Sequence, residues 1–221
     1  LDLGLYFEAF DEFVKRLNPN TDAKGIYKHI KPGKILEKEG RIENVLTPGQ
    51  MIIVQIVKEP ISTKGSRLTA EISLAGRNIV LLPFAEKVSV SQKISSKEEK
   101  RRLETLVRSI LPKNYGAIIR TAAEGKNAAV LDAELMSLIE KWENSWKTLA
   151  RSKGVQLLFT EYSKTTTILR DLLNDSFNNI YVNNETIYEE IRKYISLISP
   201  EQEKIVKLYK DKTPIFDHFE V

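Results

Sequence analysis

Residues 68–82 read LTAEISLAGRNIVLL, and this stretch decides the fold class of the chain. Apolar and polar residues alternate from Leu68 to Leu74, which is typical of a β-strand with one buried face. The sequence Ala75-Gly76-Arg77-Asn78 favours a turn, and residues 79–82 are rich in β-branched and apolar side chains. We therefore expect two strands joined by a turn at Gly76.

Downstream, the sequence alternates between predicted helices and strands. Ser96 and Glu99 have the spacing of a capping box, in front of a helix that Pro112 closes. An apolar stripe from Leu131 to Leu149 recurs at helical spacing and predicts a long helix, which Gly154 ends. We expect further strands at 88–91, 115–120, 155–159 and 179–182, and further helices at 165–173, 186–198 and after Pro200. This order predicts an α+β protein containing an α/β layer.

Upstream, residues 1–47 have a loop-rich pattern with one short amphipathic helix that ends near Asn18-Pro19. Its apolar residues are Leu5, Phe7, Phe10, Phe13, Val14 and Leu17. The stretch from Lys31 to Gly40 is polar and turn-forming, so we expect a surface insertion. Residues 51–57 are short and rich in β-branched residues, which favours a buried strand, and residues 62–67 form a loop.

Composition limits the class of protein. The 221 residues are 42% hydrophobic, enough for one large or two small domains, and the net charge of +4 with a pI near 9.0 is compatible with an anionic partner. The chain has no cysteine, which excludes disulfides and cysteine-ligated zinc and fits a cytoplasmic protein. Neither a signal peptide nor an apolar run of about 18 residues is visible. Because the sequence opens with Leu1 rather than Met, we expect a cut or processed chain.

The sequence offers no convincing hydrolytic site. Nucleophile-elbow, Walker and dinucleotide-binding motifs are absent, and neither His29 nor His218 has metal-ligand spacing, so both are expected to be ordinary surface or packing residues. Asp132 and Glu134 are two residues apart on the predicted long helix and do not share a face. We therefore expect them to be solvated helix charges.

Two basic sites could bind phosphate. Arg120 and Thr121 follow a predicted strand and precede a glycine-containing loop, and a guanidinium beside a hydroxyl suits a phosphate monoester if both converge on one hollow. Lys64 and Arg67 flank Gly65 in a loop between strands, where they could meet an RNA backbone. From local sequence alone, both also fit ordinary solvated surface positions.

Several motifs in order resemble the ribonuclease E/G family. They are Gly49-Gln50-x-Ile52-x-Val54-Gln55-Ile56-x-Lys58-Glu59, Thr63-Lys64-Gly65, Leu68-Thr69, Ile72-Ser73-Leu74-Ala75-Gly76, Ile119-Arg120-Thr121-Ala122, Glu124-Gly125-Lys126, Ile205-Val206-Lys207-Leu208-Tyr209 and Pro214-Ile215-Phe216. The resemblance runs in register from about residue 44 to the end, and the insertion in 1–43 resembles that of Bacteroidetes-type ribonuclease G. It implies a partial OB-fold RNA-binding barrel with insertion at 1–69, a 5′-sensor subdomain at 70–163 and a partial RNase H-like subdomain at 164–221.

The resemblance also implies roles for individual residues. In the family, an Arg-Thr pair receives the RNA 5′-monophosphate, and this pair corresponds to Arg120 and Thr121. The residues that support the terminal nucleotide correspond to Gly76 and Val80. The barrel lysine that lies near RNA corresponds to Lys64. The catalytic aspartates that hold Mg²⁺ and the Cys-x-x-Cys zinc link of the family have no counterpart in these residues. We therefore expect no cofactor in this chain and no cleavage by it.

The function implied is the RNA-binding, 5′-monophosphate-sensing part of an endoribonuclease that acts on single-stranded RNA in mRNA decay and rRNA processing. The expected partner is single-stranded RNA and not a membrane, the expected location is the cytoplasm, and the parent enzyme is expected to be a Mg²⁺-dependent homo-oligomer. Two alternatives stay open: a non-catalytic RNA-binding adaptor, and a scaffold protein without an RNA role.

Overall fold

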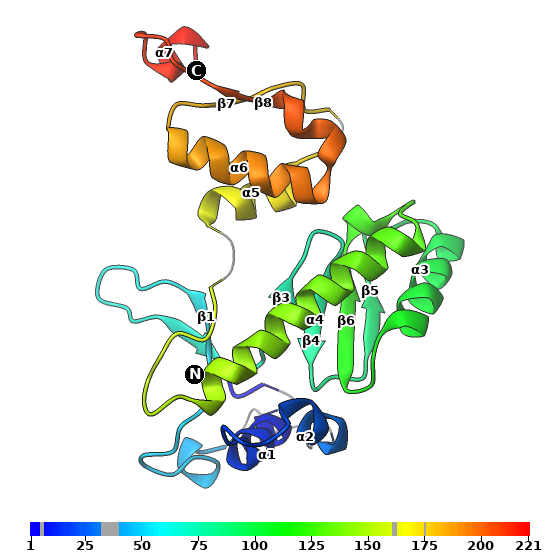
Figure 1. The fold of residues 1–221 in the computed structure, drawn as a ribbon, viewed down its shortest axis with the longest axis vertical. Helices are drawn as coiled ribbons and strands as arrows, with labels where there is room; N and C mark the ends of the chain where they lie inside the picture. Colours follow the sequence, from blue (N-terminus) through cyan, green and yellow to red (C-terminus); the bar gives the residue numbers. More distant parts are fainter. Residues whose placement is uncertain (5–6, 32–39, 161–162, 175) are drawn as a thin grey trace. The chain divides into compact units, whose positions relative to one another are not determined.

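The computed structural model describes residues 1–4, 7–31, 40–160, 163–174 and 176–221. Leu5 of the predicted first helix and residues 32–39 of the predicted insertion lie outside the described residues. The chain forms two compact units, Leu1–Phe159 and Thr160–Val221. Helices and strands occur in both, so the fold class is α+β, as predicted (Figure 1).

A four-stranded sheet is the centre of the first unit. In sheet order its strands are β3 (Leu74–Ala75), β4 (Ile79–Pro83), β6 (Tyr115–Ile119) and β5 (Val88–Val90). β4 pairs antiparallel with β3 and β6, whereas β5 pairs parallel with β6. The turn predicted at Gly76 therefore joins two neighbouring strands. The single strand predicted from Leu68 to Leu74 is wrong, because residues 70–73 separate β2 (Arg67–Thr69) from β3. The alternation survives as burial: Ala70, Ile72 and Leu74 are buried, whereas the intervening residues are partly exposed.

Two helices pack against the sheet. α3 (Lys97–Ile110) begins at Ser96, whose hydroxyl accepts a hydrogen bond from the Glu99 amide at 3.2 Å, and α4 (Ala128–Ala150) begins at Asn127, which caps the Val130 amide at 3.0 Å. α4 contacts β3, β4 and α3, and it runs across the sheet in Figure 1. Its buried side chains include most of the predicted stripe: Leu131, Leu135, Leu138, Trp142 and Trp146. These side chains and the inward side of the sheet form one hydrophobic core.

The amino-terminal residues complete this core with aromatic side chains. α1 (Phe7–Arg16) confirms the predicted amphipathic helix, and Phe10 and Phe13 pack on Phe84 and on the tryptophans of α4. A second helix, α2 (Ala23–His29), was not predicted, because it is short and contains a glycine. Asp22 caps α2, which is the signal that could have located it. A single 3₁₀ turn, η1 (Ile42–Asn44), follows.

Tyr27 of α2 connects two strained turns. Its hydroxyl donates to the Asn114 carbonyl and accepts from the Phe84 amide at 3.2 Å, and the Asn114 side chain donates to the Tyr27 carbonyl at 2.8 Å. Phe84 and Asn114 have φ values of 61° and 67°, in the left-handed region, which costs Phe84 about 1–2 kcal/mol and which asparagine adopts more readily. Because these turns follow β4 and precede β6, Tyr27 holds together one end of the strand pair.

The remaining two strands of the first unit form a separate hairpin, and the first of them differs from its prediction. β1 (Gln55–Lys58) pairs antiparallel with β2 (Arg67–Thr69), but the buried strand predicted over 51–57 is wrong: it begins four residues later and leaves Ile56 61% exposed. The strand predicted at 155–159 is also wrong, since the segment has no secondary structure and Val155 is 95% exposed. In both segments, the apolar and β-branched composition indicated a strand. Composition alone does not show whether another element of the protein packs against the segment and buries it.

The second unit builds its own small core. Its elements are α5 (Lys164–Leu172), β7 (Ile180–Val182), α6 (Glu185–Ile198), η3 (Pro200–Ile205), β8 (Val206–Leu208) and α7 (Ile215–His218). β7 and β8 pair in parallel, with α6 as the crossover helix. The buried residues are Leu169, Leu173, Val182, Ile191, Tyr194, Ile195 and Val206. In the described part of both units, no helix is long and apolar enough to cross a lipid bilayer.

We expect Tyr27→Phe to destabilise the first unit by about 1–3 kcal/mol, because it leaves a buried carbonyl and a buried amide without their partner. Urea unfolding followed by circular dichroism measures this loss. The control is Tyr181→Phe, the same chemical change at a partly exposed tyrosine, for which we expect less than about 0.5 kcal/mol. Equal stability of the Tyr27 and Tyr181 variants would contradict a bridging role for the Tyr27 hydroxyl.

Candidate functional site

One face of the four-stranded sheet is partly open. Ile79 and Leu81 of β4 are buried, whereas Val80 between them is only half-buried. Val80 pairs with Ala75 on β3 and with Ile118 on β6, so the three side chains share a face, where Ile118 is 38% exposed. Arg120 continues β6 in an extended conformation two residues after Ile118. Its side chain therefore leaves the strand on this open face.

Arg120 is attached to the turn between β3 and β4. Its Nη1 donates to the Gly76 carbonyl at 2.9 Å, and its backbone amide donates to the Asn78 carbonyl at 2.8 Å. Val80 lies on the same strand pair, opposite Ala75, which precedes Gly76. The structure thus brings Gly76, Val80 and Arg120 to one end of the sheet, although 44 residues separate Gly76 from Arg120 in sequence.

Thr121 has its contact on the other side of β6. It begins the 3₁₀ helix η2 (Thr121–Ala123), and its Oγ1 lies 3.1 Å from Oγ of Ser91, the residue after β5. Ser91 is itself fixed, since its amide donates to the Ile119 carbonyl at 2.8 Å. Arg120 therefore bonds to the β3–β4 turn and Thr121 to the segment after β5. Ser91 was not among the predicted site residues, and only strand pairing brings it to Thr121.

The loop after Thr121 is held by the first turn of α3. The Glu99 carboxylate accepts from the Gly125 amide at 2.8 Å and from Arg102 at 2.6 and 2.7 Å, and Arg102 also donates to the Lys126 carbonyl at 3.0 Å. Gly125 has a φ of +71°, which favours glycine. The predicted capping box is half correct: Ser96 caps the helix, but Glu99 turns to the loop instead of returning to Ser96. These hydrogen bonds, first from Arg102 and then from Gly125, lower the pKa of Glu99 to about 2.

Glu134 corrects a prediction made from the sequence. It is not a solvated helix charge: its carboxylate accepts from the Arg77 amide and, at 3.0 Å, from the Asn78 amide in the β3–β4 turn. Burial raises the pKa of Glu134, while these amide donors act in the opposite direction. Glu134 is partly buried and lies one helical turn from Leu131 and Leu138, at the edge of the buried stripe of α4. A charged residue at the edge of an apolar stripe was the signal that could have identified it.

Lys64 and Arg67 lie in a different element, the hairpin of β1 and β2. Lys64 and Ile61 exchange backbone hydrogen bonds of 3.0 Å across the loop, and Arg67 begins β2 opposite Lys58. Both basic side chains belong to exposed residues. The structure therefore places them together with each other, and not at the end of the sheet with Arg120.

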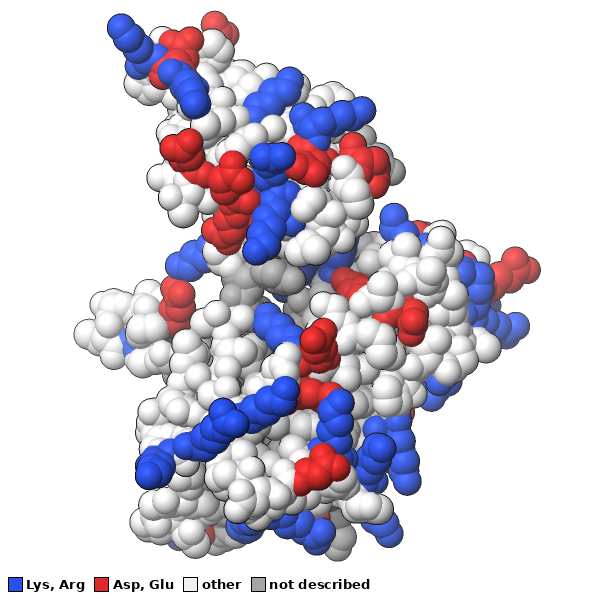
Figure 2. Space-filling view, viewed as in Figure 1, with Lys and Arg blue, Asp and Glu red and all other residues white. Residues whose placement is uncertain are grey.

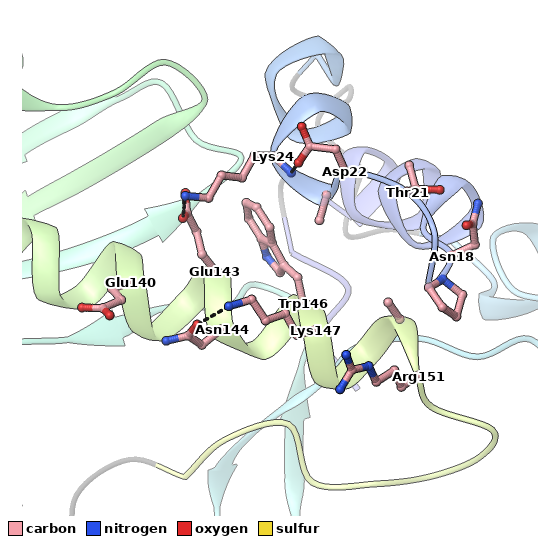
Figure 3. A pocket seen from close by; sticks show the side chains of 13 residues that line it. Asn18, Thr21, Asp22, Lys24, Glu140, Glu143, Asn144, Trp146, Lys147 and Arg151 are labelled. Atoms are coloured by element: carbon pink, nitrogen blue, oxygen red, sulfur yellow. Dashed lines mark hydrogen bonds and ion pairs between the residues drawn. The ribbon is translucent and has the colours of Figure 1, made fainter.

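Charges of both signs also occur elsewhere on the described residues, on the surface and around one hollow. On the face shown in Figure 2, Lys and Arg side chains are interspersed with Asp and Glu. A hollow of about 420 Å³ between the α1–α2 connection and α4 is lined by three acidic and three basic side chains (Figure 3). Several of its charges are already paired, since Lys24 lies 2.8 Å from Glu143 and Lys147 donates to Asn144 at 3.2 Å. His29 ends α2 and His218 ends α7. Neither belongs to a metal-binding group among the residues that the structure describes.

Comparison with known proteins gives a consistent result. The model of the ribonuclease E/G family matches residues 73–221. Ribonuclease G of Escherichia coli is 35% identical over 180 residues, which cover 81% of this chain and 37% of that protein. A ribonuclease E/G-like protein of Pyropia yezoensis is 34% identical over 86% of this chain and 39% of its own length, and ribonuclease E of Nostoc is 31% identical over 86% and 28%. The chain thus spans about two-fifths or less of the length of these relatives.

The Glu99 contacts predict a pH dependence. Because the pKa of Glu99 is lowered from 4.5 to about 2, its ionised form stabilises the folded protein above pH 4.5, and this contribution is lost as the pH falls towards 2. In Glu99→Gln, the free energy of unfolding should depend less steeply on pH in that window. Urea unfolding at several pH values checks this, with Glu98→Gln on the exposed side of the same turn as the control. Identical pH slopes in Glu99→Gln and the unsubstituted protein would contradict the assignment.

Proposed function

The chain belongs to the ribonuclease E/G family, and on this premise we propose that it is the RNA-binding and 5′-end-sensing part of a single-strand-specific endoribonuclease. Within it, residues 1–69 would be part of an OB-fold barrel with an insertion, 70–163 the 5′ sensor, and 164–221 part of an RNase H-like subdomain. The division of the chain into compact units near residue 160 supports the second of these boundaries.

The attachment of Arg120 to Gly76 is the observation that carries this proposal. A free arginine side chain loses rotational entropy on binding, whereas a guanidinium already bonded to a turn loses less. Arg120 has five N–H donors in a planar fork, which matches the oxygens of a phosphate. The hydrogen bond to Gly76 thus orients a phosphate-binding group at the end of an open sheet face.

A terminal phosphate suits this location better than an internal one. A 5′-monophosphate carries about −1.5 to −2 charges and three terminal oxygens, whereas an internal diester carries one charge. Arg120 and Thr121 are bonded on opposite sides of β6, so a phosphate bound by both would lie over the end of that strand. The half-buried apolar surface of Val80 lies on the Arg120 side, where the terminal nucleotide would be supported.

RNA cleavage is proposed for the whole enzyme and not for these residues. In the described part of the chain, no three His, Asp or Glu side chains are placed to hold a metal ion. We assign no step of hydrolysis to this chain. A non-catalytic adaptor would use the same binding site, and RNA cleavage by the whole protein separates that alternative from the enzyme.

Arg120→Ala should remove the preference for 5′-monophosphorylated RNA. A charge-assisted hydrogen bond contributes about 1.5–3 kcal/mol, so we expect roughly a 10- to 100-fold loss of affinity for the monophosphate and little change for 5′-hydroxyl RNA of the same sequence. Fluorescence anisotropy with both oligomers measures the two dissociation constants. Thr121→Val should act in the same direction and more weakly.

The matched control is Arg108→Ala, which removes an exposed arginine that pairs with Glu104 on α3. It should leave the preference unchanged. Equal affinity of the unsubstituted protein for both oligomers would overturn the sensor assignment, whatever the variants do.

Lys64→Ala should lower the affinity for the 5′-monophosphate and 5′-hydroxyl oligomers equally. A lysine that contacts the RNA backbone contributes to affinity through counterion release, so its loss reduces the slope of log affinity against log salt by about 1. Anisotropy titrations at several salt concentrations give this slope, with Lys113→Ala on an exposed turn as the control. A selective loss for the monophosphate alone would instead place Lys64 at the RNA end.

A further inference from the structure

One peptide group lies between a carboxylate and a guanidinium. The Gly76–Arg77 peptide offers its carbonyl to Nη1 of Arg120 at 2.9 Å and its N–H to the carboxylate of Glu134. In a trans peptide these two groups point in opposite directions, so the two partners lie on opposite sides of the chain. Glu134 and Arg120 are thereby connected through a single rigid plane without contacting each other.

The same carboxylate fixes the next peptide as well. Asn78 donates its amide to Glu134 at 3.0 Å and its carbonyl accepts the Arg120 amide at 2.8 Å. Two successive amides of the turn therefore face Glu134, and the two carbonyls at Gly76 and Asn78 both face Arg120. The turn is thus bonded to Glu134 through its amides and to Arg120 through its carbonyls.

Within the turn, the Gly76 amide donates to the Ile79 carbonyl at 2.8 Å, which fixes the peptide that precedes Gly76. Gly76 has no side chain to restrict its backbone, so the peptide that follows it rotates more easily than any other in the turn. Only glycine fits here, because a Cβ atom would lie 2.6 Å from Oε1 of Glu134 and 2.8 Å from the Ile79 carbonyl. Because the site accepts only glycine, the orientation of the following peptide has to be fixed by a group outside the turn. The Glu134 carboxylate does this through its hydrogen bonds to the Arg77 and Asn78 amides.

We propose that Glu134 is a positioning residue for RNA 5′-end recognition, which orients the Gly76–Arg77 peptide so that its carbonyl holds the Arg120 guanidinium ready for a terminal phosphate. This inference rests on the proposed function of Arg120. Hydrogen bonds in series strengthen one another in a poorly solvated environment, so the negative charge behind the peptide makes the Gly76 carbonyl a better acceptor. Glu134 acts without touching RNA, from a helix on the covered side of the sheet.

The experiment compares Glu134→Gln with Asp132→Asn. Glutamine has the size of glutamate but is neutral, and it carries an NH₂ group where glutamate has its second oxygen. The substitution therefore removes the negative charge behind the Gly76–Arg77 peptide and replaces one of the two oxygens that face the turn amides with a donor. Asp132 is two residues earlier on α4, and in the described part of the chain it makes no hydrogen bond to the turn. Each variant is first checked for folding by circular dichroism, and its affinities for 5′-monophosphate and 5′-hydroxyl RNA are then measured.

A second readout follows Arg120 itself. The rotation of its guanidinium group, measured by nuclear magnetic resonance of the Nη signals without RNA, is slow while the Gly76 carbonyl holds it. We expect Glu134→Gln to speed this rotation and to lower the affinity for 5′-monophosphate RNA about tenfold. The affinity for 5′-hydroxyl RNA should not change. Asp132→Asn should resemble the unsubstituted protein in both measurements. A purely structural role of Glu134 would lower both affinities together.

The outcomes separate the two proposals. If the unsubstituted protein prefers the monophosphate, Arg120→Ala loses this preference and Glu134→Gln keeps it, the positioning role is overturned and the proposed function stands. If the unsubstituted protein shows no preference, the proposed function fails and this inference fails with it. Should Glu134→Gln not fold, acid titration of the unsubstituted protein decides the question. Guanidinium rotation that does not change while the Glu134 carboxyl titrates overturns the inference.

Discussion

The antiparallel pairing of β4 with β6 is the constraint on which the first unit depends. Five residues of each strand are in register, from Ile79 opposite Ile119 to Pro83 opposite Tyr115. A shift by one residue would exchange the buried and exposed faces and move Arg120 away from the turn that holds it. Both ends of this pair are fixed from outside the sheet: Tyr27 bonds to the turns at one end, and Glu134 to the turn at the other. The turn that holds Arg120 is therefore bonded both to the strand pair and to α4.

Core formation and site formation use the same helix. The buried stripe of α4 carries leucines and tryptophans of the core, and the partly buried Glu134 lies next to Leu135 on the same helix. Burying a carboxylate is unfavourable unless it is hydrogen-bonded, and the two amides of the turn meet that requirement. The partly buried carboxylate at the edge of this core thus bonds to the turn, and the turn bonds to Arg120.

The sequence predicted most of the regular elements, because periodicity records which face of an element is covered. The strand pair around Gly76, the helix after Ser96 and the stripe of α4 follow from residue order alone. Among the failures are residues 51–57 and 155–159, whose apolar composition predicted strands although much of each segment is exposed. The strand predicted from Leu68 to Leu74 is interrupted, and the short helix α2 was not predicted. Within the candidate site, Arg120 and Thr121 could be proposed because they adjoin a strand end. Ser91, Glu99 and Glu134 could not, since their partners are 30, 26 and about 57 residues away and become neighbours only through strand pairing and helix packing.

The position of Trp142 and Trp146 has a practical consequence for spectroscopy. These are the two tryptophans of the chain, and both are buried on α4 among aromatic side chains of α1 and α2. Tryptophan fluorescence therefore reports on the unfolding of residues 1–159. Residues 160–221 contain no tryptophan, so their unfolding is not followed directly by this signal. A difference between an emission curve and a backbone-sensitive curve would measure how independently the two units lose their structure.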